Sequence, residues 1–174
     1  WIKLRILIDT NIWIYLYIVG LEWVIEGIIK AGHEVWITDG VTRELMVKMH
    51  DNAYAGTVRM IRDGTVTVVD VPEQDSARPP IHEKAEDELI AVAARDSSAL
   101  GIYMLITNDD SAIKRGQRAG IISAGILGFF GWCHLHGILS LDGAARGYDG
   151  LVDNGMKFKT PRARFLQDLA NRTG

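Results

Sequence analysis

The sequence predicts an α/β fold, a three-layer α/β/α arrangement around a central and mainly parallel sheet. Two apolar runs of strand length, 5–8 and 103–106, each end in a cluster of short polar side chains. Strands that are apolar on both faces are typical of parallel sheets covered by helices. Further short β-rich runs alternate with segments of helical periodicity, as parallel sheets require. The chain of 174 residues is long enough to form one domain around a real core.

Five β-rich runs predict the strands of this sheet. Each run is short, rich in β-branched or other apolar residues, and followed by turn or capping residues. The third run alternates Thr and Val after the turn signal Asp63-Gly64. In chain order, the predicted strands are 5–8, 34–38, 65–71, 102–107 and 121–123.

Helical periodicity fills the spaces between these strands and the carboxyl-terminal region. Asn11 stands at the expected N-cap of the first helix, and Gly20 and Gly32 end the first two helices. A break is indicated at 51–52, and a segment with three prolines, 72–80, predicts a loop across the mouth of a cleft. The predicted helices cover 12–19, 21–30, 39–62, 82–95, a stretch that includes Lys114, 125–138, 141–151 and 161–172.

Composition limits the class of protein. An apolar content of 48% with 24% charged residues is ordinary for a globular chain. The single cysteine, Cys133, excludes an internal disulfide framework and favours a reducing, cytoplasmic location. The apolar stretch ending near Leu21 is shorter than the roughly 20 residues that span a bilayer, so we expect no membrane span. The net charge of −3 gives no global signal for nucleic acid, so binding would need a local patch.

Polar clusters at two strand ends are the first candidates for a site. Asp9 follows the first strand, and Thr10 and Asn11 stand next to it. Thr107 and Asp109 follow the 102–107 strand in the same manner. The carboxyl ends of parallel strands form the ligand crevice of such sheets, so these side chains are expected at one cleft.

Two helices bring further carboxylates towards that cleft. Glu44 lies early in one helix, and Glu86 and Asp87 lie in the first turn of another. Any one acid in such a place has an ordinary explanation, because helix starts favour negative charge. Four carboxylates in one cleft would repel strongly, and a divalent cation removes this conflict. Hard oxygen ligands favour Mg²⁺ or Mn²⁺, which suit phosphoryl chemistry.

Four short motifs together resemble those of PIN-domain ribonucleases. The order and spacing agree over residues 4 to about 124, and the remainder resembles the carboxyl-terminal helical extension of VapC-type toxins. The motifs are Leu7-Ile8-Asp9-Thr10-Asn11, Val41-Thr42-Arg43-Glu44-Leu45, Glu86-Asp87-Glu88-Leu89-Ile90-Ala91 and Leu105-Ile106-Thr107-Asn108-Asp109-Asp110. The resemblance implies a Mg²⁺- or Mn²⁺-dependent endoribonuclease, often dimeric and often neutralised by an antitoxin protein.

The resemblance also implies roles for individual residues. The third acid is either Glu86 or Asp87, depending on how the motif is aligned, and we take Asp87 as the catalytic choice. The expected catalytic residues are Asp9, Glu44, Asp87 and Asp109. The expected metal ligands are Asp9, Glu44, Glu86, Asp87, Asp109 and Asp110, supported by Thr10, Asn11 and Thr107. Candidates for phosphate contact are Lys114, Arg115 and Arg118. On this basis, residues 1–124 form the catalytic domain and 125–174 a helical extension packed on it.

Two other functions and one assembly are also open. One alternative is a catalytically silent module that binds RNA or protein. The other is a phosphoaspartate domain in which Asp9 is the phosphoacceptor. Asn11 stands where a phosphatase of that kind would carry a second aspartate. The helix over 12–18 carries Tyr15 and Tyr17 and more apolar surface than one sheet covers, so we expect a homodimer or higher homo-oligomer.

Overall fold

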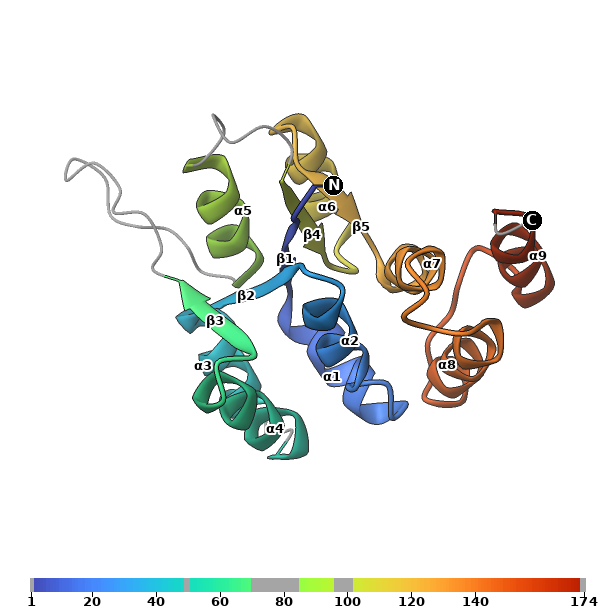
Figure 1. The fold of residues 1–174 in the computed structure, drawn as a ribbon, viewed down its shortest axis with the longest axis horizontal. Coiled ribbons are helices and arrows are strands. Elements are labelled where there is room, and N and C mark those ends of the chain that lie inside the picture. Colours follow the sequence, from blue (N-terminus) through green and yellow to red (C-terminus); the bar gives the residue numbers. More distant parts are fainter. Residues whose placement is uncertain (1, 49–50, 70–84, 96–101, 173–174) are drawn as a thin grey trace.

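A five-stranded, all-parallel sheet forms the centre of the molecule, in the order β3-β2-β1-β4-β5. The computed structural model describes residues 2–48, 51–69, 85–95 and 102–172 (Figure 1). The strands are β1 (Arg5–Ile8), β2 (Glu34–Thr38), β3 (Val66–Val69), β4 (Tyr103–Ile106) and β5 (Ile122–Ala124). The two runs with the most apolar composition, β1 and β4, are neighbours in the sheet, and this explains why both are buried on both faces.

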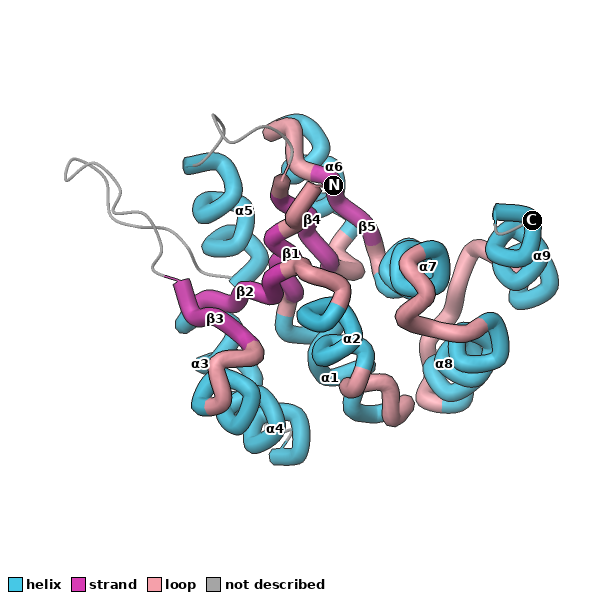
Figure 2. Tube along the Cα trace, in the orientation of Figure 1, coloured by secondary structure: helices cyan, strands magenta, loops and turns pink. Residues whose placement is uncertain are grey.

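Helices cover the sheet and continue beyond its last strand. Figure 2 shows α5 and α6 on one side of the sheet, α1 to α4 on the other, and α7 to α9 beyond β5. The first six are α1 (Thr10–Ile18), α2 (Val24–Lys30), α3 (Asp39–Val47), α4 (Asp51–Arg62), α5 (Ala85–Arg95) and α6 (Asp110–Arg118). The last three are α7 (Ile126–Leu135), α8 (Leu141–Asp153) and α9 (Arg162–Arg172). The predicted α/β fold with a parallel sheet is confirmed.

Several predicted boundaries were wrong. α1 is capped by Asp9, whose carboxylate accepts a hydrogen bond from the Thr10 N–H, so Asn11 already lies inside the helix. The break indicated at 51–52 within the predicted helix 39–62 is present but lies a few residues earlier, because α3 ends at Val47 and α4 begins at Asp51. The predicted loop at 72–80 lies outside the described residues. No helix in the described ranges is long and apolar enough to cross a membrane.

The apolar surface of α1 is covered within the chain itself. Trp13 is fully buried, and its indole N–H donates to the Ile8 carbonyl over 3.1 Å. The Tyr17 ring packs on α4, where a Cβ added to Gly56 would lie 1.9 Å from the Tyr17 hydroxyl. Val19, at the end of α1, packs in the same way against Gly150 of α8. Part of the apolar surface that suggested a dimer is thus covered by α4 and α8, while Ile18 remains 43% exposed, and the dimer stays a prediction.

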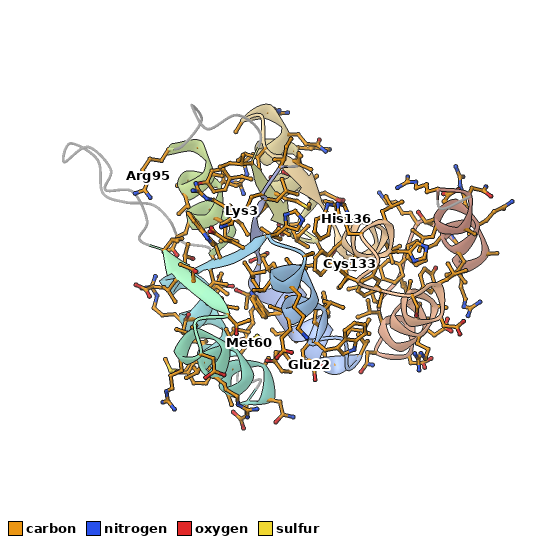
Figure 3. All side chains as sticks on the ribbon, viewed as in Figure 1. Lys3, Glu22, Met60, Arg95, Cys133 and His136 are labelled. Atoms are coloured by element: carbon orange, nitrogen blue, oxygen red, sulfur yellow. The ribbon has the colours of Figure 1, made fainter. Side chains whose placement is uncertain are left out.

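The carboxyl-terminal helices share the core of the sheet. Buried side chains from α7, α8 and α9, such as Phe129 and Leu151, belong to the same hydrophobic cluster as those of β1 and β4. Cys133 is fully buried there, and burial raises the pKa of its thiol, so it is an inert core residue (Figure 3). His33, next to β2, reaches the same helices. Its ring lies 5.2 Å from the ring of Trp132 and 5.9 Å from that of His136.

We expect the free energy of unfolding to fall when the pH is lowered from 7.5 to 5. The Nδ1 atom of His33 accepts a hydrogen bond from the Leu4 N–H over 3.0 Å, so protonation there would break this bond. Burial, and then the charge of nearby His136, lower the pKa of His33 from 6.5. The stabilisation is therefore complete above pH 6.5 and is lost as the pH falls through the lower folded pKa. The slope is at most about 1.4 kcal/mol per pH unit.

Urea unfolding of the wild type and of His33→Gln at both pH values measures this effect. Because glutamine does not titrate, the variant should lose less stability between pH 7.5 and 5 than the wild type. An equal loss in the two proteins would contradict the prediction.

Candidate active site at the carboxyl edge of the sheet

Asp9 lies at the centre of the sheet's carboxyl edge and is held in one orientation. Its residue is only 4% exposed. One carboxylate oxygen, Oδ1, accepts from the Thr10 N–H over 2.7 Å. The other, Oδ2, accepts from the Thr107 hydroxyl over 2.8 Å. The parallel pairing of β1 with β4 brings Asp9 and Thr107 together, although they are 98 positions apart in the chain.

Thr107 also connects Asp9 to Asp109. Its hydroxyl oxygen accepts from the Asp109 N–H over 3.3 Å, and Asp109 caps α6 through the Ala112 N–H at 2.7 Å. The predicted grouping of these strand-end residues is therefore present. Asp110 is exposed in the first turn of α6. Asn108 Oδ1 accepts from the Ile126 N–H at the start of α7 over 2.9 Å, which ties the same edge to the carboxyl-terminal helices.

Glu44 reaches this edge from α3 and is engaged with two partners. Its Oε1 accepts from the Ala85 N–H, the first residue of α5, over 3.0 Å. Its Oε2 lies 3.8 Å from the Lys48 ammonium, which also donates to Asn11 Oδ1 over 2.9 Å. Lys48 therefore joins two of the predicted site residues, and the sequence analysis did not include it. Its spacing of four residues from Glu44 on one helix is the signal that would have indicated the pair.

Asp87, the predicted third acid, forms an ion pair with Arg115 of α6. Arg115, predicted as a phosphate contact, is thus paired with a carboxylate, while Lys114 and Arg118 are exposed on α6. The Glu86 side chain lies outside the described residues. The choice between Glu86 and Asp87 as third acid therefore stays open.

Of the α5 acids whose side chains the structure describes, Glu88 is the buried one, and it was not predicted as a site residue from the sequence. The residue is 6% exposed. Its Oε2 accepts from the Gly40 N–H over 2.9 Å, and its Oε1 accepts from Arg43 over 3.2 Å. A Cβ on Gly40 would lie 2.2 Å from Oε2, so this contact needs glycine. Glu88 falls at helical spacing with the buried residues Ala85 and Val92, and this spacing could have predicted an inward direction.

Glu88 takes over a role that would otherwise belong to Thr38. Thr38 is the N-cap residue of α3 by position, yet its hydroxyl makes no capping hydrogen bond, because the Gly40 N–H is bound to Glu88. Within the described residues, the Thr38 hydroxyl is buried without a hydrogen-bond partner. Leu7 pairs with Trp36 and Leu105, so two residues further along Thr38, Asp9 and Thr107 end neighbouring strands on one face of the sheet.

The side chains at this edge suit a divalent cation in donor chemistry. Asp9 and Asp109 supply carboxylate oxygens, the ligands that Mg²⁺ and Mn²⁺ prefer. In the described part of the chain, however, no three His, Cys, Asp or Glu side chains converge closely enough to hold a metal ion. Glu44 and Asp87 each contact a cationic side chain of this chain instead. For Glu44 to act as a third metal ligand beside Asp9 and Asp109, its carboxylate would have to move away from Lys48. For Asp87 to do so, its carboxylate would have to move away from Arg115.

The fold of this chain is similar to that of solved structures. No family model matches the chain, and no curated protein matches it. The chain is similar to a structure entitled "Structure of the PIN domain endonuclease Utp24", with a TM-score of 0.49 and 19% sequence identity. The similarity covers 69% of this chain and 84% of that one. The function of this chain is therefore inferred from the residues at the carboxyl edge.

Proposed function

We propose that this protein is an endoribonuclease that hydrolyses RNA phosphodiester bonds at the carboxyl edge of its sheet. The observation that carries the proposal is the Asp9–Thr107–Asp109 linkage, in which the Thr107 hydroxyl donates to the buried Asp9 carboxylate and accepts from the Asp109 backbone N–H. Glu44 and Asp87 extend from α3 and α5 towards the neighbouring helices of the same edge.

The proposal includes Mg²⁺ or Mn²⁺ as cofactor. Asp9 and Asp109 would hold the ion, with a third ligand from Glu44, Asp87 or Glu86, and with Asp110 close enough in sequence to assist through water. When bound, such an ion lowers the pKa of a water molecule and neutralises phosphate charge. The chain's own residues supply the rest. Thr107 and the Thr10 N–H fix the Asp9 carboxylate, and Lys48 brings a positive charge that an RNA phosphate can contact.

The biological setting follows from the motif resemblance and is proposed with it. We propose that the chain acts in the cytoplasm as the toxin of a toxin–antitoxin pair, and that it works as a homodimer or higher homo-oligomer. We also propose that residues 1–124 form the catalytic domain and 125–174 the extension. The hydrogen bond from the Ile126 N–H to Asn108 supports close packing of that extension beside the site.

Incubation of the purified protein with mixed RNA tests the activity directly. Cleavage should appear with Mn²⁺ or Mg²⁺, disappear with EDTA, and be absent in Asp9→Asn under every condition. RNA binding without cleavage in all metal conditions would instead indicate the catalytically silent module. Cleavage that Asp9→Asn retains in full would point to a contaminating nuclease and contradict the proposal.

A further inference from the structure

A short basic segment runs from the end of α8 into the first turn of α9, in a chain that is acidic overall. Between Asp153 and Asp168 the sequence has no acidic residue, while the whole chain has a net charge of −3. The cations of this segment are all exposed, and nitrogen-ended side chains fan out around α9 in Figure 3. We call the segment the basic strip, and its cations are Lys157, Lys159, Arg162 and Arg164.

The basic strip is held in place by an aromatic cluster beneath it. The Phe158 ring lies 4.9 Å from the Tyr148 ring of α8, and Tyr148 also stacks on Phe165 of α9 at 5.6 Å. The Tyr148 hydroxyl donates to the Thr160 carbonyl over 2.7 Å. Exposure therefore alternates along the strip: Phe158 packs inward, and Lys157 on one side and Lys159 on the other face solvent.

Among the residues that the structure describes, three of these four cations have no acidic partner. Arg162 forms a two-pronged ion pair with Asp149, with distances of 2.7 and 3.1 Å, and this contact raises the pKa of Arg162. For Lys157, Lys159 and Arg164, no carboxylate within the described ranges lies within 4.0 Å. The first turn of α9 also lacks acids, although helix starts favour negative charge. The strip thus keeps an uncompensated positive potential at some cost to stability.

We propose that the basic strip is a binding surface for the phosphate backbone of single-stranded RNA. The choice of RNA rests on the proposed nuclease function, and the rest follows from the strip itself. Its apolar side chains, Met156 and Phe158, pack against the core and are only partly exposed, so they offer little surface for stacking on bases or entering a lipid bilayer. Lys157, Lys159 and Arg164 remain for contact, and they match the repeated negative charges of a nucleic-acid strand. Binding at this surface is therefore independent of sequence and strongly dependent on salt.

Fluorescence anisotropy with a labelled single-stranded RNA, in EDTA to prevent cleavage, tests the proposal. The variant is K157Q/K159Q, and the matched control is K30Q/R62Q, which removes the same charge from exposed sites on α2 and α4. The strip variant should bind about tenfold more weakly at low salt than the control. Its slope of log Kd against log salt should fall by about 0.7 for each lost phosphate contact, or about 1.4 in total.

The outcomes separate this proposal from the proposed function. If the strip variant and the control bind RNA with equal affinity and equal salt slope, the proposed RNA-binding surface is overturned, whatever the nuclease assay shows. A wild type that does not bind RNA would also overturn it. Sedimentation with phosphatidylserine vesicles tests the other possible partner, an anionic membrane. If K157Q/K159Q binds RNA normally and loses only its binding to these vesicles, the strip is not an RNA-binding surface. If the protein binds RNA through the strip but never cleaves RNA, the proposed binding surface is supported and the proposed nuclease function is rejected. Circular dichroism confirms that each variant is folded.

Discussion

Asp9→Asn should lower the rate of RNA cleavage by about 10²-fold or more, on the order of 3 kcal/mol of barrier. The substitution removes the negative charge and keeps the shape of the side chain. One amide oxygen can still accept from the Thr10 N–H, and the Thr107 hydroxyl can rotate to accept from the new amide group. The loss should therefore appear in kcat/KM, while the urea midpoint stays close to that of the wild type.

Asp109→Asn provides a matched test, because asparagine caps helices as well as aspartate does. The asparagine Oδ1 can still accept the hydrogen bond from the Ala112 N–H, so α6 should stay intact while the carboxylate is lost. Asp9→Asn/Asp109→Asn should cost far less than the product of the two single effects if both carboxylates serve one centre. Asp142→Asn, in the first turn of α8, is an exposed control that should leave the rate unchanged. Near-wild-type cleavage by either single variant would reject the shared centre.

The arrangement of Asp9, Thr107 and Asp109 could be predicted from the sequence because of the strand geometry. Parallel strands that are neighbours end at the same edge, so polar residues directly after them must meet. The apolar composition of β1 and β4 was enough to place both near the centre of the sheet. Both predictions depend only on the apolar composition of each strand and on the rule that neighbouring parallel strands end at one edge. Neither prediction requires knowledge of which side chains contact one another.

The partners of the helix acids could not be predicted in the same way. Asp87 and Glu88 lie in the first turn of α5, where an acid is favoured whatever its tertiary role. Glu44 lies in the second half of α3, and its contact with the Ala85 N–H joins residues far apart in the chain. Which of them is buried depends on how α5 rotates against α3, and that rotation is decided by packing of Ala85 and Leu89. The coverage of α1 by α4 and α8 is likewise a long-range result. The sequence of an apolar helix does not distinguish whether the helix is covered by its own chain or by a second copy of the chain.

Glu88→Ala should destabilise the fold by about 2–4 kcal/mol, the largest stability effect that we expect from one site residue. The buried Gly40 N–H would lose its Glu88 acceptor, at a cost of up to about 1–3 kcal/mol that the Thr38 hydroxyl can offset only in part, and a cavity would remain between α3 and α5. Glu88→Gln keeps an oxygen for the Gly40 N–H and should lose less. Urea unfolding measures both variants, and a Glu88→Ala midpoint within error of the wild type would contradict the assignment.

Thr38 gives this prediction a sharper form through a double-mutant cycle. In the wild type its hydroxyl makes no hydrogen bond within the described residues, so Thr38→Val should be close to neutral or slightly stabilising. Once Glu88 is removed, the same hydroxyl can cap α3 by accepting from the Gly40 N–H. Thr38→Val should then cost about 1 kcal/mol in the Glu88→Ala background, a reversal of sign between the two backgrounds. Equal effects of Thr38→Val in both backgrounds would show that Glu88 does not replace Thr38 at the start of α3.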